Sequence, residues 1–245
     1  MRSFPIPAPA FDGRCRAVGI DAVFAWLRLA WNLFMVRPAA WVAGALILIA
    51  GALALMTVWL IGPLLAGLLA PVLAAGLLTM CRKAADGEAV GLSDLAAGFS
   101  TRTTPLILLG VILMLAMLAI QVVVLVLLGG SVASGLLLSG IGGLGILLGG
   151  SIVAMLLSSL LFIPLSMALW FAPALVLFNG MPPIEACRAS FAASLKNLLP
   201  LLLLGLIVFV LGVFAALPAG LGFLVLIPVL AGTAYASWQD VFVAH

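Results

Sequence analysis

Residues 103–184 read TTPLILLGVILMLAMLAIQVVVLVLLGGSVASGLLLSGIGGLGILLGGSIVAMLLSSLLFIPLSMALWFAPALVLFNGMPPI, which is 82 residues without Asp, Glu, Lys, Arg or His. Two further charge-free stretches of 44 and 43 residues cover 38–81 and 197–239. A charged side chain at the bilayer centre costs about 2.5 to 3.5 kcal/mol, and a helix needs about 20 apolar residues to cross the hydrocarbon core. These stretches therefore predict an all-α protein, a bundle of helices that crosses a membrane several times.

The composition agrees with a membrane protein and narrows the possible functions. The 245 residues are 67% hydrophobic and 7% charged, with a mean hydropathy of +1.45, which excludes a soluble domain and a disordered chain. The net charge of +3 is explained by membrane topology, so we expect no nucleic-acid partner. Spans without ionisable residues lack the groups that carry proton relays, ion coupling or acid–base chemistry.

The charged residues do not have the pattern of an active site. They include no paired carboxylates at a catalytic spacing, no nucleophile beside a base and no glycine loop of the phosphate-binding type. The single histidine, His245, has no partners at a metal-ligand spacing. The sequence therefore predicts a protein that is not an enzyme and that has no catalytic, cofactor-binding or metal-binding residues.

Six membrane spans fit between the charged zones, arranged as three hairpins. The predicted spans are 39–60, 62–81, 105–128, 152–178, 199–217 and 220–239, with the first hairpin turning at Gly62-Pro63. The zones on one side hold five, three and two Lys or Arg, whereas the hairpin tips hold none, which predicts that both termini are cytoplasmic. Residues 1–18 are expected to form a flexible cytosolic tail before a single membrane domain over 19–242.

A short amphipathic segment that ends at a proline precedes each hairpin. The apolar residues of these segments recur at the spacing of one helical face, which predicts three interfacial helices in the cytosolic leaflet, in contact with membrane lipids. The aromatic residues expected on their lipid faces are Phe24, Trp31, Phe99 and Phe191. With the spans, these helices define repeat units of about 19–81, 91–178 and 183–240. The alternative is that short Leu, Ala and Gly strings in the three units match one another by chance.

Prolines and polar residues inside the spans are candidates for helix packing or ligand contact. Pro164 and Pro173 flank Trp170, and an interior proline kinks a helix by removing one backbone hydrogen bond. Trp170 is expected to be a packed or lipid-facing aromatic, with the wall of a cavity as the alternative. Gln121 is expected to make an interhelical hydrogen bond, with a ligand contact as the alternative.

Residues 129–151 contain nine glycines and no charge. Glycine weakens an isolated helix, and the stretch is too apolar for a solvated loop. It could form a re-entrant or surface-lying element, or pack closely against another helix through Gly145 and Gly149, or take part in gating or substrate passage.

Two stretches carry a resemblance to known proteins, PVLAAGLLTMCRKAADGEAVGLSDLAAGF at 71–99 and WFAPALVLFNGMPPIEACRASFAASLKNLLP at 170–200. They resemble a family of uncharacterised proteobacterial inner-membrane proteins of about this length, over about residues 26–242. The chain is more distantly similar to the membrane domain of some glycerophosphodiester phosphodiesterases. The resemblance implies a bacterial inner membrane and a six-helix layout with interfacial helices, and it assigns no active residues.

Two functions from different classes fit these observations. The first is a non-enzymatic envelope scaffold, assembly factor or accessory subunit, with another membrane protein or a second copy as its partner. The second is a transporter or channel for an apolar or lipid-like solute, which needs a kinked apolar path and no intramembrane charge. A cavity beside Trp170 and Gln121 would favour the second function.

Overall fold

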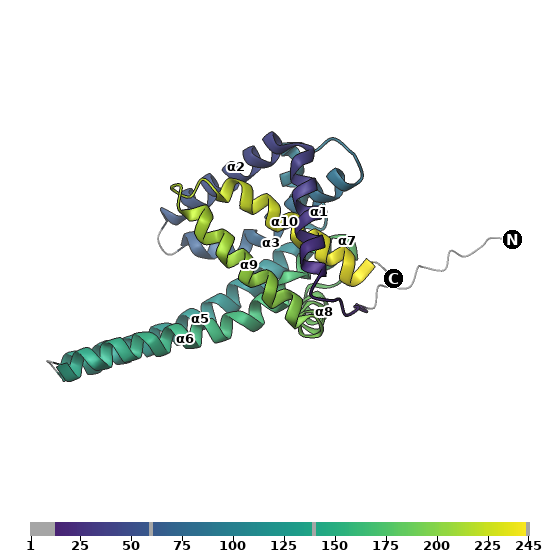
Figure 1. Cartoon of the computed structure of the whole chain (residues 1–245). Coiled ribbons are helices and arrows are strands. Elements are labelled where there is room, and N and C mark those ends of the chain that lie inside the picture. Colours follow the sequence, from purple (N-terminus) through teal and green to yellow (C-terminus); the bar gives the residue numbers. More distant parts are fainter. Residues whose placement is uncertain (1–12, 59–60, 139–140, 244–245) are drawn as a thin grey trace.

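The computed structural model describes residues 13–58, 61–138 and 141–243, and the regular structure within these ranges is helical. The elements are α1 (Ala22–Val36), α2 (Pro38–Met56), α3 (Ile61–Ala85), η1 (Leu92–Ala96), α4 (Ala97–Ser100), α5 (Thr103–Leu137), α6 (Ile141–Trp170), α7 (Ala172–Phe178), α8 (Pro183–Lys196), α9 (Leu198–Ala216), α10 (Phe223–Trp238) and the π-helical turn η2 (Gln239–Val243). They form a bundle from which the paired helices α5 and α6 project far to one side (Figure 1).

Within the described residues, five helical segments are long and apolar enough to cross a membrane by length and composition. They lie in α2, in α3, in α5, in the stretch that joins α6 and α7, and in α9. The structure is therefore that of an all-helical, multi-pass membrane protein. α10 has 16 residues, slightly fewer than the roughly 17 to 25 that a span needs, so the predicted count of six is not confirmed.

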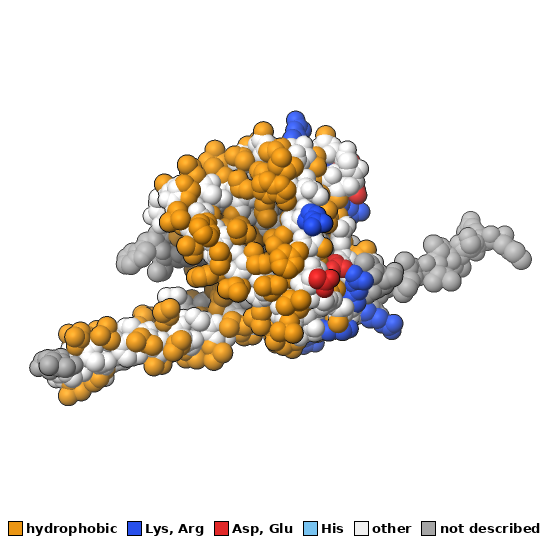
Figure 2. Space-filling model, in the orientation of Figure 1, with side chains coloured by type: hydrophobic (Ala, Val, Ile, Leu, Met, Phe, Trp, Pro, Cys, Tyr) orange, Lys and Arg blue, Asp and Glu red, His pale blue; other side chains and the backbone are white. Residues whose placement is uncertain are grey.

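Charged side chains gather at the end of the bundle that lies away from the α5–α6 tip (Figure 2). This distribution follows from the sequence, because the charge-free stretches supply the long helices and the charged zones supply their connections on one side. We call this end of the molecule the charged face.

The turn predicted at Gly62-Pro63 is wrong in position, because α3 already begins at Ile61. A proline is tolerated in the first turn of a helix, where its missing N–H has no intrahelical acceptor. Gly62 allows the start of α3 to approach the end of α2, since a Cβ at this position would overlap the carbonyl oxygen of Leu55.

α1 lies across the charged face and packs on α10, where the backbones approach at Ala30 and Gly232. Its buried residues are Val23, Trp26, Ala30, Leu33 and Phe34. Phe24, Trp31 and Met35 remain 49% to 59% exposed on another side of the helix. α1 thus uses part of its predicted apolar surface for the protein core and leaves part of it uncovered.

The second amphipathic segment is shorter and less regular than an interfacial α-helix. It consists of the 3-10 turn η1 and the single turn α4, both packed on α3. Asp94 fixes the segment by accepting hydrogen bonds from the backbone N–H of Gly91 at 2.8 Å and from Nζ of Lys83 at 2.6 Å. This segment is thus held by a carboxylate at its helix start and by an ion pair to α3, whereas α1 is held by a longer apolar stripe.

Within the glycine-rich stretch 129–151, α5 continues to Leu137 and α6 begins at Ile141, and these two helical parts form the outer part of the α5–α6 hairpin. α5 alone has 35 residues, or about 52 Å at 1.5 Å per residue, compared with a hydrocarbon core of about 30 Å. The helices meet closely at Gly135 and Gly143, where a Cβ on Gly143 would overlap the carbonyl oxygen of Gly135. Gly145 and Gly149 have no atoms within 4 Å of their Cβ positions, so close packing through that pair is wrong.

The N-terminal segment 13–18 is held against the C-terminal end of the chain, which differs from the predicted flexible tail. Arg16 donates its backbone N–H to the carbonyl oxygen of Val241 at 3.0 Å and forms an ion pair with Asp240. The side-chain amide of Asn197 accepts from the N–H of Val18 at 2.8 Å and donates to the carbonyl oxygen of Arg16 at 3.0 Å. Residues 1–12 of the predicted tail lie outside the described residues.

α3 and α5 form an extensive seam at Gly110, where a Cβ would overlap the carbonyl oxygen of Leu68. We expect Gly110→Ala to destabilise the protein by about 1 to 3 kcal/mol, because the added methyl group forces the two backbones apart. Helix propensity acts in the opposite direction by about 1 kcal/mol.

The matched control is Gly129→Ala, also in α5, where no atom lies within 4 Å of the Cβ position. This variant should be as stable as the wild type or more so. The unfolding temperature in mild detergent reports both effects, and equal temperatures for the two variants would contradict a backbone contact at Gly110.

Candidate functional site

Two apolar cavities meet at Ser166 and Trp170 near the end of α6. The central pocket, with a volume of about 490 Å³, is lined by residues of α3, α5, α6, α7 and α10 and is partly open to the outside. The lateral pocket, with a volume of about 410 Å³, lies between α6 and the α8–α9 corner. Both volumes fall in the range of about 300 to 1,000 Å³ that small-molecule sites occupy.

The walls of the central pocket come from side chains that face one another across the bundle. α5 contributes Leu113 and Met117, α6 contributes Leu165, and α10 contributes Leu230 and Ala231. The side chains named for both pockets are apolar except for Ser166, Ser194 and the indole N–H of Trp170, and none of them is charged. Such a site can exclude water and hold an apolar molecule, but it offers no groups for acid–base chemistry.

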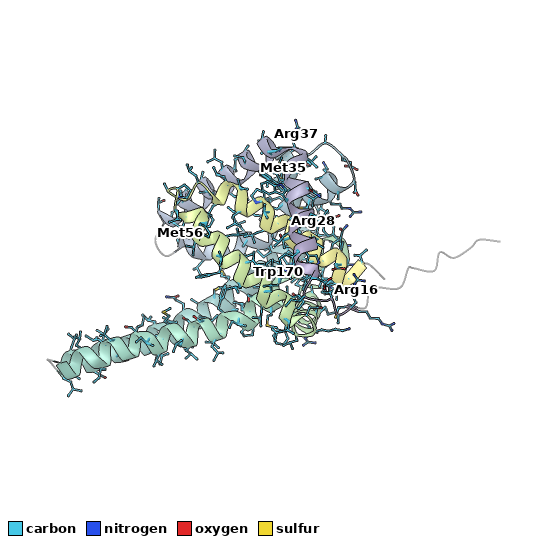
Figure 3. All side chains as sticks on the ribbon, in the orientation of Figure 1. Arg16, Arg28, Met35, Arg37, Met56 and Trp170 are labelled. Carbon is cyan, nitrogen blue, oxygen red and sulfur yellow. The ribbon has the colours of Figure 1, made fainter. Side chains whose placement is uncertain are left out.

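Trp170 lies at the base of the α5–α6 hairpin, where the two cavities adjoin (Figure 3). Its indole N–H donates a hydrogen bond to Oγ of Ser237 on α10, with an N–O distance of 3.2 Å. This bond ties the end of α6 to α10 although the two helices do not pack extensively along their lengths. The structure thus places Trp170 in a cavity wall, the alternative that the sequence left open.

A break in the helix immediately after Trp170 shapes this end of the site. The N–H of Phe171 donates to Oγ of Ser190 at 3.0 Å, and that hydroxyl donates to the carbonyl oxygen of Met167 at 2.7 Å. The hydroxyl of Ser190 therefore bridges the two backbone groups that a continuous helix would join directly. Ser194 supplies a second donor to Met167 at 3.1 Å, and both serines are fully buried.

Other hydroxyls do not have this role. Ser158, Ser159 and Ser166 donate to carbonyl oxygens three or four residues earlier in α6. The backbone of the kinked region is therefore satisfied from α8, a helix that is far away in the sequence. No spacing rule within one span identifies such a partner.

We expect Ser190→Ala to destabilise the protein by about 1 to 3 kcal/mol, because it leaves the N–H of Phe171 without its acceptor in an apolar interior. The control is Ser158→Ala, whose exposed hydroxyl bonds only to its own helix and whose loss should change stability by less than about 0.5 kcal/mol. Denaturant unfolding in detergent, followed by tryptophan fluorescence, measures the difference. Similar unfolding midpoints would argue against the bridging role.

Aromatic side chains pack together one helical turn beyond the wall of the central pocket. Phe178 and Trp238 follow Ala174 and Ala234 of the pocket wall by one helical turn, and their ring centroids lie 4.6 Å apart. Tyr235 contacts both rings, and the guanidinium of Arg82 lies 5.4 Å from the centre of Phe178.

The remaining candidates from the sequence are less closely associated with the cavities. Pro173 lines the central pocket, whereas Pro164 lies within α6 between the lining residues Ile163 and Leu165. The side chain of Gln121 is exposed on α5 outside both pockets, and no interhelical hydrogen bond forms from it within the described residues. The interhelical hydrogen bond of Gln121 therefore stays a prediction.

The aromatic residues predicted for the interfacial helices are accessible from outside the bundle. Phe24, Trp31 and Phe99 are 59%, 49% and 49% exposed, and Phe191 is half-buried. They lie on the amphipathic segments near the charged face, where a lipid headgroup region would meet them.

Asp94 and Cys187 are ionisable groups outside the spans whose pKa values are shifted by their surroundings. Burial works against the charged form of Asp94, yet the hydrogen bonds from Lys83 and from the N–H of Gly91 lower the pKa of this carboxyl. Burial raises the pKa of Cys187, so its thiol stays protonated. No group of three or more His, Cys, Asp or Glu that could hold a metal occurs in the described part of the chain.

Comparison with known proteins gives one informative similarity. The chain is 28% identical over 220 residues to a protein of Burkholderia thailandensis named as a probable inner membrane protein, covering 87% of this chain and 80% of that one. No protein-family model matches the sequence, and no solved structure matches it. A link to glycerophosphodiester phosphodiesterases is not found among these comparisons.

Proposed function

We propose that this chain is an integral protein of a bacterial inner membrane that binds an apolar, lipid-like molecule in the central pocket and moves or presents it within the membrane. The observation that carries the proposal is the central pocket itself, about 490 Å³ of apolar space in the part of the molecule that a bilayer would surround. Its walls provide shape and apolar contact without charge, which suits a hydrocarbon chain. The name of the Burkholderia relative supports the inner-membrane location.

The proposal includes six spans with both termini in the cytoplasm. α10 continues into η2, so helical chain runs from residue 223 to residue 243 and reaches a length of about 30 Å. The position of Lys and Arg on the charged face supports a cytoplasmic orientation of that face (Figure 2).

The scaffold function is a second candidate, and the outer part of the α5–α6 hairpin favours it. Leu136, Leu137 and Leu138 at its end are 73%, 86% and 59% exposed, and the hairpin extends past the other helices (Figure 1). Another membrane protein could pack on this extension, whereas the central pocket has no role in such an assembly. The two functions are therefore separable by experiments on the pocket.

We expect Ala231→Phe to fill part of the central pocket. The amount of co-purified lipid-like molecule should fall about tenfold, because overpacking an apolar site weakens binding by about this factor. Ala52→Phe, on an exposed position of α2 outside both pockets, is the control and should retain the molecule. Mass spectrometry of the protein purified in native lipid measures both. Retention by Ala231→Phe together with a stoichiometric protein partner would support the scaffold instead.

Orientation can be measured with single cysteines in a variant whose Cys15, Cys81 and Cys187 are replaced by Ala. Ser134→Cys near the hairpin tip should react with a membrane-impermeant maleimide in intact spheroplasts. Arg188→Cys on the exposed side of α8 should react only after the membrane is opened. The reverse labelling would contradict cytoplasmic termini.

A further inference from the structure

The first spans of the second and third hairpins begin with nearly the same sequence, PLILLG at 105–110 and PLLLLG at 200–205. In α5, the final glycine of this sequence is Gly110, which packs against the backbone of α3 at Leu68. In α9, the corresponding residue is Gly205, which has no atom within 4 Å of its Cβ position and lines the lateral pocket. The same local sequence therefore makes a helix contact in one place and faces a cavity in the other.

The missing partner of Gly205 can be identified from the repeat. Leu68, the partner of Gly110, lies three residues before Pro71 in α3. Leu161 lies three residues before Pro164 in α6, so it is the residue that corresponds to Leu68. The second span of one hairpin forms a seam with the first span of another in two cases, because α3 packs extensively on α5 and α10 packs extensively on α2. α6 and α9 have no comparable seam among the described residues, and Leu161 is 36% exposed. The lateral pocket occupies the place where this third seam would be.

We infer that the lateral pocket is a binding site for one long acyl chain, which lies against Gly205 and takes the place of the missing contact between α6 and α9. The inference rests on the membrane placement proposed above and does not depend on an occupant of the central pocket. The cavity of about 410 Å³ is walled by apolar side chains such as Ile163, Leu202 and Leu206. Gly205 adds to its width by presenting backbone without a side chain.

The polar atoms of the lateral pocket show which part of a lipid it accepts. The hydroxyl of Ser194 donates to the carbonyl oxygen of Met167, and the indole N–H of Trp170 donates to Ser237. Ser166 donates to the carbonyl oxygen of Ile163. Because these donors are already used inside the protein, the site accommodates a hydrocarbon tail and leaves any headgroup outside. A tail of a phospholipid and a free fatty acid share this chemistry.

The test uses the full chain in vesicles of phosphatidylethanolamine and phosphatidylglycerol that contain a phosphatidylethanolamine with a photoreactive diazirine in one acyl chain. After irradiation, peptide mass spectrometry should find the label on α9 around Leu202 and Leu206. Gly205→Leu should lower this labelling about tenfold, because its side chain enters the pocket. Gly212→Leu, on the same helix and with no atom within 4 Å of its Cβ position, should leave labelling unchanged.

Each outcome decides the inference. Labelling absent from α9 in the wild type, or equal in Gly205→Leu and Gly212→Leu, would overturn it. Labelling lost in Gly205→Leu but kept in Ala231→Phe would support the lateral site even where the central pocket fails as a binding site. Native mass spectrometry of the wild type then distinguishes the sources, since a bound phospholipid and a bound fatty acid differ in mass.

A disulfide test shows whether α6 closes the pocket instead. At the α3–α5 seam, the Cβ position of Gly67 lies 4.0 Å from Cα of Met114, so Gly67→Cys with Met114→Cys is the positive control. By position in the repeat, the corresponding pair on α6 and α9 is Leu160→Cys with Phe209→Cys, both exposed in this structure. In a variant without native cysteines, we expect oxidation to link the first pair and not the second. Efficient linking of the second pair within one chain would mean that helix contact, and not an acyl chain, fills the site.

Discussion

The structure depends on the requirement that every backbone N–H and C=O group be paired where no water is available. Helices satisfy this requirement along their length, so the difficult positions are the ones where a helix breaks. At the break after Trp170, the hydroxyl of Ser190 joins the N–H of Phe171 to the carbonyl oxygen of Met167. One buried serine of α8 thus pairs the backbone where α6 ends and α7 begins, at the base of both pockets.

Close packing of small residues sets where the helices touch and where they do not. Gly110 brings α5 onto the backbone of α3, and Gly232 brings α10 onto α1. These contacts fix α5 and α10, while α6 is tied to the bundle by Trp170 and by the serines of α8. α6 also pairs closely with α5 along the hairpin, but among the described residues it forms no comparable seam with α9 or α10, and this leaves space for both cavities at its base. The cavities are therefore a property of how α6 is attached, and not of any polar recognition cluster.

The sequence predicted the helical membrane character and the place of most long helices, because charge-free length is a strong constraint that does not depend on tertiary contacts. It failed where a contact with a distant segment decides the outcome. The glycines of 129–151 weaken a single helix, yet two such helices pair closely at Gly135 and Gly143. Gln121, the most polar residue of the spans, lies outside the cavities, whereas Ala231 and Gly205 line them and carry no chemical group that a sequence pattern could single out.

The contact between the segment 13–18 and the end of the chain has a consequence for biogenesis. Arg16 pairs with Asp240 and Val241, and Trp26 of α1 donates its indole N–H to Asp240 at 2.8 Å. α1 also buries its inner side against α10, the last long helix. The first described helix therefore has its main packing partner in the last long one. Because α10 is synthesised after every span between them, α1 can pack on it only once those spans have been made.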